Sequence, residues 1–343
     1  MRVFITGATG FIGSALANRL AAEGHEVRAL VRPGADASRL APEVERLPGR
    51  LDDRTFLAKV LGRMDPGDAV AHLAGTTKAF TARGFRLVNE DLAWELVETA
   101  RSAGPKGLLF LHVSSQAAAG PCAVPPGIAE EHRPAPVSQY GLSKLLGERA
   151  ALSLAPQHHV AVIRPSMVYG PGDTAFVPLY SLMRRGLLTV SGPPGQRMSL
   201  VHIRDLVDGM VLALKALRDG SVEGGRIYHL AGPQDMDWES YAGAFAAALE
   251  RPRVRILRVP EALLSAIAWG NALQHCLGLP SSHLTPDKCR EARQEGWLLD
   301  SSRAMRELGY APGCDLASGA RETIAWCRSQ GLLPRRAPAK ARP

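Results

Sequence analysis

A tyrosine and a lysine stand one helical turn apart in the segment "VSQYGLSKLLGER" (137–149). Residues at i and i+4 lie on one face of a helix, so Tyr140 and Lys144 would share a site. A cation held beside a phenol favours the phenolate and lowers the pKa of the phenol from about 10. Such a tyrosine can donate or accept a proton near neutral pH. The spacing alone also fits an ordinary amphipathic helix, so other parts of the chain must decide.

A glycine-rich turn follows the first apolar run of the chain. The stretch "RVFITGATGFIG" (2–13) places Gly7, Gly10 and Gly13 between a strand-like run and a helical pattern, which is the context of a dinucleotide-binding turn. Gly7 permits the tight turn, Gly10 lets the backbone approach a pyrophosphate, and Gly13 permits close packing of helix on strand. The N–H groups of Phe11 and Ile12 would point at the phosphate from the helix N-terminus.

The end of the next strand indicates which dinucleotide is preferred. An acidic side chain there would bind both ribose hydroxyls of NAD and repel the additional phosphate of NADP. The segment "ALVRPGADASRL" (29–40) instead has Arg32 at the strand end and Arg39 further on, with Asp36 as the only nearby acid. An arginine can stack on adenine and contact a phosphate bidentately. The sequence therefore favours NADP(H) over NAD(H).

The first half of the chain alternates strand-like and helix-like segments. Short apolar runs such as "VRALV", "DAVAHLAG", "GLLFLHVSS" and "VAVIRPSMVYG" are separated by amphipathic segments. Strands separated by helices of this length form βαβ units around a parallel sheet. We therefore expect the α/β class, with a Rossmann-type doubly wound parallel sheet and a smaller C-terminal α/β substrate lobe.

The alternation loosens after about residue 170, where loops rich in Pro and Gly begin. We expect an NAD(P)-binding Rossmann domain over 1–170, to which later segments return, and a substrate-binding lobe over 171–333. Residues 334–343, "PRRAPAKARP", are predicted to be a disordered basic tail. The apolar helix predicted over 260–277 is expected to line a core or a pocket rather than to lie on a membrane, because polar residues interrupt it.

Composition narrows the class of protein. The hydrophobic fraction of 46% and the charged fraction of 22% are those of a globular domain, and no apolar run is long enough to span a membrane. The start of the chain has no apolar core of a signal peptide, so the cytoplasm is the expected compartment. Half of the net charge of +8 comes from the tail, and no basic run is interleaved with aromatics, so no nucleic-acid partner is expected.

No metal site or disulfide framework is expected either. The five cysteines are scattered and lack Cys-x-x-Cys spacing. His112, His132, His158 and His159 lack the spacing of metal ligands and are expected at the surface or in packing contacts.

Several motifs now stand in a fixed order along the chain. They are the glycine turn, "HLAG" (72–75), "VSS" (113–115), the Tyr140–Lys144 pair and "RPSMVYGPGD" (164–173). As a set they resemble the extended branch of the short-chain dehydrogenase/reductase superfamily, the NAD-dependent epimerase/dehydratase family. In character the chain is similar to the dihydroflavonol-reductase and 3β-hydroxysteroid-dehydrogenase relatives. The resemblance spans nearly the whole chain, including "SLVHIRDLVDGM" (199–210) and "LDSSRAMRELGYAP" (299–312).

This resemblance implies a catalytic set. Tyr140 would be the general acid/base on the substrate oxygen, and Lys144 would hold the nicotinamide ribose and lower the pKa of the tyrosine. The family's serine falls within Ser114–Ser115, and its distance from Gly120 favours Ser115. The residues implied to contact the cofactor are Gly7, Thr9, Gly10, Phe11, Ile12, Gly13, Arg32, Leu51, Leu73, Ala74, Gly75, Tyr140, Lys144 and Pro165.

Other positions carry weaker implications of the resemblance. Asn89 matches an asparagine common near the site, although a polar residue at the start of a helix explains it equally well. Where relatives have an aspartate for the adenine amino group, this chain has Arg50, which leaves the backbone of Leu51 as a contact. Helices around 88–102 and 140–154 pair subunits in many relatives, so a homodimer is expected.

Residues expected to face the substrate distinguish among the chemistries of the family. Dehydratases carry acidic residues after the serine, whereas this chain has Gln116 followed by alanines. Sugar-nucleotide enzymes often have an asparagine where Met167 stands here. They also tend to have a diphosphate-binding arginine where our register places Met198, although a register slipped by one residue would supply Arg197. The expected substrate is therefore a small molecule of low polarity.

These inferences lead to one expected function and two alternatives. We expect an NADP(H)-favouring oxidoreductase that interconverts a secondary alcohol and a ketone at a Ser-Tyr-Lys site. The first alternative is a nucleotide-sugar 4-epimerase with tightly bound NAD and no net redox change. The second is a cofactor-binding subunit without turnover, which would not need all three residues of the catalytic set.

Overall fold

The computed structural model describes residues 1–155, 157–277, 279 and 284–334. Its largest element is a seven-stranded sheet in which every paired strand runs parallel. Across the sheet, the strands are β10 (Arg226–Leu230), β6 (His159–Pro165), β5 (Leu109–Val113), β4 (Ala69–His72), β1 (Arg2–Thr6), β2 (Glu26–Val31) and β3 (Glu45–Pro48). The strand order reverses between β1 and β4, where doubly wound sheets bind their cofactors. The predicted Rossmann-type α/β fold is confirmed.

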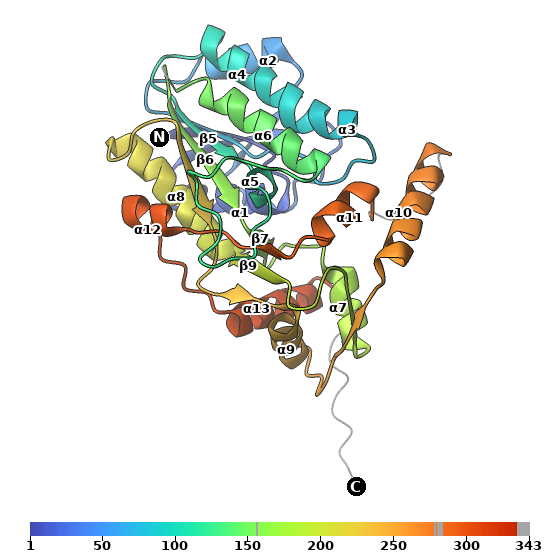
Figure 1. Cartoon of the computed structure of the whole chain (residues 1–343). Helices are drawn as coiled ribbons and strands as arrows, with labels where there is room; N and C mark the ends of the chain where they lie inside the picture. The colour runs from blue at the N-terminus through green and yellow to red at the C-terminus, as the bar shows by residue number, and fades with distance from the viewer. Residues whose placement is uncertain (156, 278, 280–283, 335–343) are drawn as a thin grey trace.

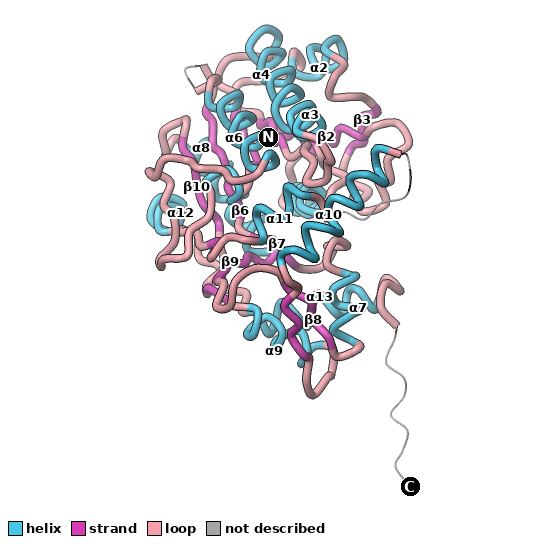
Figure 2. Tube along the Cα trace, turned by 45° about the vertical axis from the view of Figure 1, so that its right-hand side comes forward, coloured by secondary structure: helices cyan, strands magenta, loops and turns pink. Residues whose placement is uncertain are grey.

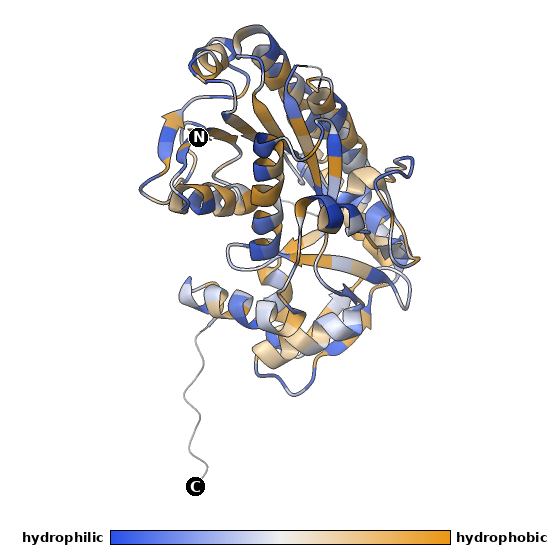
Figure 3. Cartoon of the chain, turned by 90° about the vertical axis from the view of Figure 1, so that its left-hand side faces the viewer, coloured by the Kyte–Doolittle hydropathy of each residue, from blue (hydrophilic) through white to orange (hydrophobic). Residues whose placement is uncertain are grey.

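Helices cover both faces of this sheet (Figure 1). One face carries α2 (Arg54–Leu61), α4 (Leu92–Ala103) and α6 (Gln139–Leu152), and the other carries α1 (Phe11–Ala22), α8 (Ile203–Asp219) and α12 (Ser302–Leu308). Alternate residues of a strand point to opposite faces, so Val3 and Ile5 join the core under α1 and α8 while Phe4 joins the other. Hydrophobic residues accordingly run along the strands of the sheet (Figure 3). Both faces are buried, as a parallel sheet requires.

A smaller group of elements lies beside the carboxyl edge of the sheet (Figure 2). A four-stranded sheet contains β7 (Met167–Tyr169), β9 (Arg197–His202), β11 (Asp235–Met236) and β13 (Gly296–Trp297), and a separate pair contains β8 (Leu187–Val190) and β12 (Arg255–Arg258). The helices here are α7 (Val177–Arg184), α9 (Trp238–Ala248), α10 (Glu261–Cys276), α11 (Pro286–Ala292) and α13 (Leu316–Ser329). Residues from these elements form a core of their own around Tyr180 and Phe245.

Later segments return from this region to the large sheet. Strand β10 pairs with β6, and α8 packs over the same face as α1. The division into a cofactor domain over 1–170 and a substrate lobe over 171–333 stays a prediction. Of the tail predicted over 334–343, residues 335–343 lie outside the described residues.

The helix predicted over 260–277 forms as α10, and the expectation that it lines a pocket is confirmed. Its residues Glu261 and Leu264 border a cavity of about 250 Å³, together with residues of the neighbouring segments. Only Ala268 and Asn271 of α10 are buried, and most of its large apolar side chains point outward. No helix in the described part of the chain combines the length and apolar character needed to cross a membrane.

Candidate active site

The residues singled out in the sequence lie at the carboxyl edge of the large sheet. The glycine turn follows β1, Leu73–Gly75 follow β4, and Ser114–Ser115 follow β5. Pro165 ends β6, and Arg32 follows β2 directly. Because the carboxyl ends of parallel strands meet at one edge, the topology brings these segments together.

The glycine turn is packed too tightly for side chains. Gly7 has φ +72°, and a Cβ there would lie 2.5 Å from the backbone of Leu73 and Ala74. A Cβ on Gly13 would lie 2.1 Å from the carbonyl oxygen of Gly7, so the helix packs on the turn itself rather than on the strand. Helix α1 begins at Phe11, and the first N–H groups of a helix have no partner within it. This bare, positively polarised helix start fits the pyrophosphate of a dinucleotide.

The three arginines near the adenosine end have different environments. Arg32 is exposed, and its side chain makes no ion pair or hydrogen bond within the described chain. Arg39 donates a 2.7 Å hydrogen bond to the carbonyl oxygen of Gly172 and lies over the ring of Trp326, so it holds the C-terminal elements to the sheet. Arg50 is paired with Asp52. Of these three arginines, Arg32 alone has its side chain both exposed and unpaired within the described chain.

Helix α6 brings Tyr140 and Lys144 onto one face, and the predicted helix is confirmed. Ser138 caps it by accepting a hydrogen bond from the N–H of Gly141 at 2.9 Å. The Lys144 ammonium is buried and donates a 2.6 Å hydrogen bond from Nζ to the carbonyl oxygen of Val113, at the end of β5. A Cβ on Gly75 would lie 3.5 Å from the same Nζ, so the lysine also borders the end of β4.

The two neighbouring serines face different partners. The Ser114 hydroxyl donates a hydrogen bond to the carboxylate of Glu148. The Ser115 hydroxyl accepts a 3.2 Å hydrogen bond from the N–H of Ala117, as the cap of the short helix α5 (Gln116–Ala119). It also lies near enough to the Tyr140 phenol to lower its pKa. The structure therefore places Ser115, and not Ser114, beside the tyrosine.

A buried ion pair lies under the site and was not found from the sequence. Glu148 and Arg164 are each about 1% exposed and form a bidentate pair with hydrogen bonds of 2.8 and 2.7 Å. Glu148 follows Lys144 by four residues, so the helical spacing that pairs Tyr140 with Lys144 could have found it. Its negative charge raises the pKa of Lys144, although burial has the larger effect and lowers that pKa to about 8.

That Lys144 lowers the pKa of Tyr140 stays a prediction, and the structure adds further groups that act on this phenol. Burial is the largest influence and raises the pKa of the phenol. The groups that lower it are Lys288, whose Nζ lies 4.8 Å from the centre of the tyrosine ring, and the Ser115 hydroxyl. Lys144 directs its ammonium toward Val113, while Lys288, far away in the sequence, lies over the tyrosine ring.

Helix α11 is a second contributor that sequence reasoning missed. The Asp287 carboxylate accepts hydrogen bonds from the N–H groups of Gln139 and Tyr140 at 2.7 and 3.0 Å, at the start of α6. Glu291 accepts from the Ser138 hydroxyl at 2.7 Å and from Lys288 at 2.8 Å. The start of the tyrosine helix is thus held by acids some 150 residues away, a contact with no local signal in the sequence.

Asn89 lies inside a π-helical turn, η1 (Leu87–Asp91), between α3 (Ala82–Arg86) and α4. Its side chain is buried, accepts from the N–H of Thr76 at 2.7 Å and donates to the Ser143 hydroxyl at 2.9 Å. Single π-helical turns are frequent at functional sites. Asn89 therefore ties the segment after β4 to α6, which is more than a cap at a helix start does.

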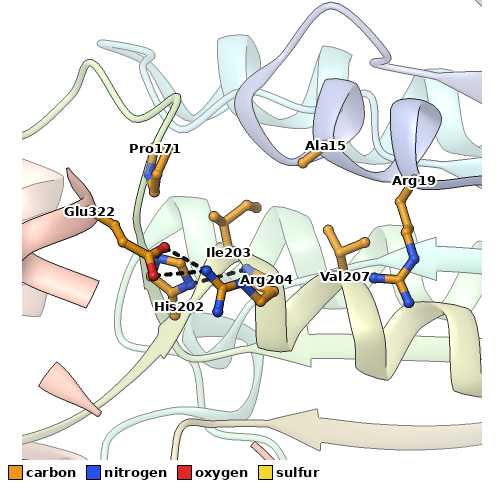
Figure 4. A pocket seen from close by; sticks show the side chains of 8 residues that line it. All are labelled: Ala15, Arg19, Pro171, His202, Ile203, Arg204, Val207 and Glu322. Atoms are coloured by element: carbon orange, nitrogen blue, oxygen red, sulfur yellow. Dashed lines mark hydrogen bonds and ion pairs between the residues drawn. The ribbon is translucent and has the colours of Figure 1, made fainter. Parts of the chain in front are cut away.

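A separate cavity of about 270 Å³ lies between α1, α8 and α13 (Figure 4). In Figure 4 the side chains of Arg204 and Glu322 face one another there, joined by hydrogen bonds of 2.8 and 2.7 Å. None of its lining residues belongs to the set predicted from the sequence. Among the described residues, no group of three or more His, Cys, Asp and Glu side chains is arranged to hold a metal ion.

Comparison with known proteins decides the family. The model of the NAD-dependent epimerase/dehydratase family matches residues 3–231. The chain belongs to this family. It is therefore an NAD(P)-dependent enzyme of the extended short-chain dehydrogenase/reductase type. This membership leaves the non-catalytic alternative without support.

Relatives within the family carry out different reactions. A ceramide reductase of Caulobacter vibrioides is 32% identical over 97% of this chain and 96% of its own length. A dTDP-glucose 4,6-dehydratase of Actinoplanes is 28% identical over 96% of this chain and 98% of its own length. The UDP-glucuronic acid 4-epimerase of Bacillus cereus, solved with UDP-glucuronic acid and NAD, has a TM-score of 0.75 at 21% identity and covers 96% of this chain and 100% of its own. That likeness concerns the fold alone.

Proposed function

We propose that this enzyme interconverts a secondary alcohol and a ketone of low polarity, with NADP(H) as the favoured cofactor. The observation that carries the proposal is the placement of the Tyr140 phenol beside the Ser115 hydroxyl, on the helix that also holds Lys144. The ceramide reductase of C. vibrioides, 32% identical, supports a reductase over other members of the family.

Each residue of the site has a defined task in this reaction. A bound nicotinamide cofactor supplies the hydride for reduction and accepts it for oxidation. Tyr140 donates its proton to the carbonyl oxygen as the oxygen gains negative charge, and Ser115 donates a hydrogen bond to the same oxygen. In the oxidation direction Tyr140 takes the hydroxyl proton. By the family resemblance, Lys144 holds the nicotinamide ribose, so its charge lies close to the reacting groups.

Apolar side chains on one side of Tyr140 and on strand β9 favour a substrate of low polarity. Phe85 and Ala117 pack against the tyrosine. Met198, at the position where sugar-nucleotide enzymes tend to have an arginine, is buried in the core of the C-terminal elements. Arg197, the residue that a slipped register would offer, points to the other face of β9, 3.6 Å from Asp235. The register of β9 thus argues against a diphosphate-binding arginine.

The preference for NADP(H) is supported by Arg32. It follows β2 where NAD-specific enzymes have an acid, and it is exposed with its side chain unpaired within the described chain. A guanidinium can bind the 2′-phosphate with two parallel hydrogen bonds.

We also propose a homodimer through α4 and α6. The large apolar side chains of Trp94 and Leu142 are each 37% exposed on these helices, and Leu87 beside them is 53% exposed. Light scattering should give the mass of two chains, and Trp94→Glu should reduce it to one. A wild-type monomer would contradict this part of the proposal.

The test begins with the purified protein titrated with NADPH and with NADH, and with mass spectrometry of any co-purifying nucleotide. We expect tighter binding of NADPH, free exchange, and consumption of NADPH in proportion to an apolar ketone reduced. Tyr140→Phe should lower turnover about a hundredfold or more while leaving NADPH affinity within a few-fold. Tightly held NAD⁺, with interconversion of nucleotide sugars and no net redox change, would instead establish the epimerase alternative.

A further inference from the structure

Helix α10 has its apolar side on the outside. A surface helix of a globular protein normally buries its apolar side and exposes its polar one. Four large apolar side chains of α10 are exposed, by 52% at Leu263, 43% at Ile267, 67% at Trp269 and 62% at Leu273, and Leu277, which caps the helix, is 65% exposed. We call these five residues the α10 apolar face. Figure 1 shows the helix at the edge of the molecule, at the right of the view.

The five side chains form one continuous stripe. With about 100° of rotation per residue, they fall within a sector of about 160°. The exposed residues Ala262, Ala266 and Gly270 lie in the same sector, and Gln274 is its one polar member. The buried Ala268 and Asn271 lie on the opposite side. The pattern is that of an amphipathic helix turned outward.

The inner side of α10 is fixed to its neighbours by specific contacts. Asn271 donates a 3.0 Å hydrogen bond to the carbonyl oxygen of Leu284, and Arg293, which caps the C-terminus of α11, pairs with Glu261 at 2.8 Å. His275 stacks on Phe80, in the segment after β4, with 4.1 Å between the ring centres. These contacts fix the orientation of the helix about its axis, so the α10 apolar face stays exposed.

Four exposed arginines lie on or beside β12, the strand that precedes α10 in the sequence. Arg253 and Arg255 alternate with half-buried residues along and just before β12, so they share its outer face with Leu257, which is 50% exposed. Arg185 lies beside them, because β8 pairs with β12, and Arg251 is exposed just upstream. We call Arg185, Arg251, Arg253 and Arg255 the arginine strip. None of the four forms an ion pair in the described part of the chain.

We propose that the α10 apolar face and the arginine strip dock together on the surface of an anionic lipid bilayer. Apolar side chains with neighbouring cations match an interface in which acyl chains lie beneath negative headgroups. Charge complementarity selects this occupant. A second copy of the chain docked on the same surface would bring its own arginine strip near the first, and like charges repel.

Docking through α10 would also set the active site near the membrane. Helix α11, which carries Lys288 over the Tyr140 ring, is the element to which α10 is fixed. This part of the inference rests on the proposed function: a ketone of low polarity dissolved in the bilayer would meet the enzyme on the side where α10 and α11 lie. The docking itself does not depend on turnover and can be tested without a substrate.

The experiment is sedimentation of the full-length protein with two kinds of vesicle. One kind contains equal parts of phosphatidylglycerol and phosphatidylcholine, and the other contains phosphatidylcholine alone. We expect binding to the first kind, much weaker binding to the second, and release as salt is raised. Brominated lipid should quench tryptophan fluorescence in the wild type, and Trp269→Phe should lose most of that quenching while it still sediments with the vesicles.

Paired substitutions separate the two components of the surface. Trp269→Ser with Leu273→Ser should weaken binding about a hundredfold, because both lose apolar area that the bilayer would cover. Arg253→Gln with Arg255→Gln should weaken it about thirtyfold, from about 1 kcal/mol for each cation near an anionic surface. All four side chains are exposed, so folding should be unaffected. Val124→Ser and Arg63→Gln, at exposed positions elsewhere, are the matched controls.

Three results would overturn the proposal: no binding to phosphatidylglycerol vesicles at low salt, binding that the α10 variants leave unchanged, or α10 variants that alter the oligomeric state instead. The same variants are assayed with NADPH and a water-soluble ketone, whose reduction should not change. If no ketone is reduced while vesicle binding still depends on α10, the proposed function fails and the docking surface stands.

Discussion

Replacing Lys144 by methionine should make the cofactor-free protein more stable at neutral pH, although it removes a residue of the candidate active site. The Lys144 side chain is about 5% exposed, and burial lowers its pKa from 10.5 to about 8. At about 1.36 kcal/mol per pKa unit, carrying the charge in the folded state costs about 3 kcal/mol at neutral pH. Methionine fills a similar volume without this cost.

Lys144→Met also removes the hydrogen bond from Lys144 to Val113, which offsets part of this gain in stability. Nζ donates to the Val113 carbonyl oxygen at 2.6 Å, and a carbonyl that loses its donor in a buried site costs about 1–2 kcal/mol. The expected net effect of Lys144→Met is therefore a gain of about 1–2 kcal/mol in the free energy of unfolding. Activity should also be lost, because Lys144 is the cation that the proposed function assigns to the nicotinamide ribose.

The pH dependence of the difference identifies its cause. Below the folded-state pKa of about 8, Lys144 is charged in both the folded and the unfolded protein. The folded wild type is then destabilised by the full free energy of burying that charge. Between about pH 8 and pH 10.5 the lysine has lost its proton in the folded protein but not in the unfolded chain. The wild type therefore becomes more stable relative to the variant as the pH rises through this range. The advantage of Lys144→Met should thus shrink as pH rises, and then reverse.

Urea unfolding of both proteins in neutral and in alkaline buffer measures this. Lys215→Met, at an exposed position of α8, is the control and should follow the wild type in both buffers. A variant less stable than the wild type at neutral pH, or a difference that does not change with pH, would refute burial of an unfavourable charge at Lys144.

Three further perturbations test other parts of the site. Arg32→Glu should raise the KM for NADPH about tenfold or more and leave the KM for NADH unchanged or lower. The reason is that a charge-assisted contact with phosphate contributes about 1.5–3 kcal/mol. Equal effects on both cofactors would mean that Arg32 does not contact the 2′-phosphate. The rate of alcohol oxidation should rise with pH, and in Lys288→Met this rise should shift to higher pH, because Lys288 lowers the pKa of Tyr140. Lys288→Arg should restore the wild-type pH dependence. An unchanged pH dependence in the methionine variant would contradict this role. Asp287→Asn should lower the free energy of unfolding by about 2 kcal/mol, since it weakens two charge-assisted hydrogen bonds at the start of α6. Asp315→Asn, at the cap of α13, should leave turnover unchanged whereas Asp287→Asn should lower it; unchanged turnover in both would refute positioning of Tyr140 by Asp287.

The local features of the site followed from the sequence. The shared face of Tyr140 and Lys144 follows from the helical period, and the glycine turn follows from spacings within a single βαβ unit. The gathering of the segments after β1, β4, β5 and β6 at one edge follows from the parallel sheet that the alternation predicts. These features depend on residues close together in the chain, where periodicity and backbone geometry determine the structure.

Only the tertiary structure shows the features that depend on residues far apart in the sequence, namely the environment of Tyr140 and the orientation of α10. Only the packing of α11 against α6 places Lys288 over the Tyr140 ring, where its charge lowers the pKa of the phenol. The outward orientation of α10 was likewise not predictable, because an apolar stripe has the same period whether it faces a core or solvent. A sequence pattern fixes which side chains share a face, whereas the elements packed around that face determine whether it is buried and which charges act on it.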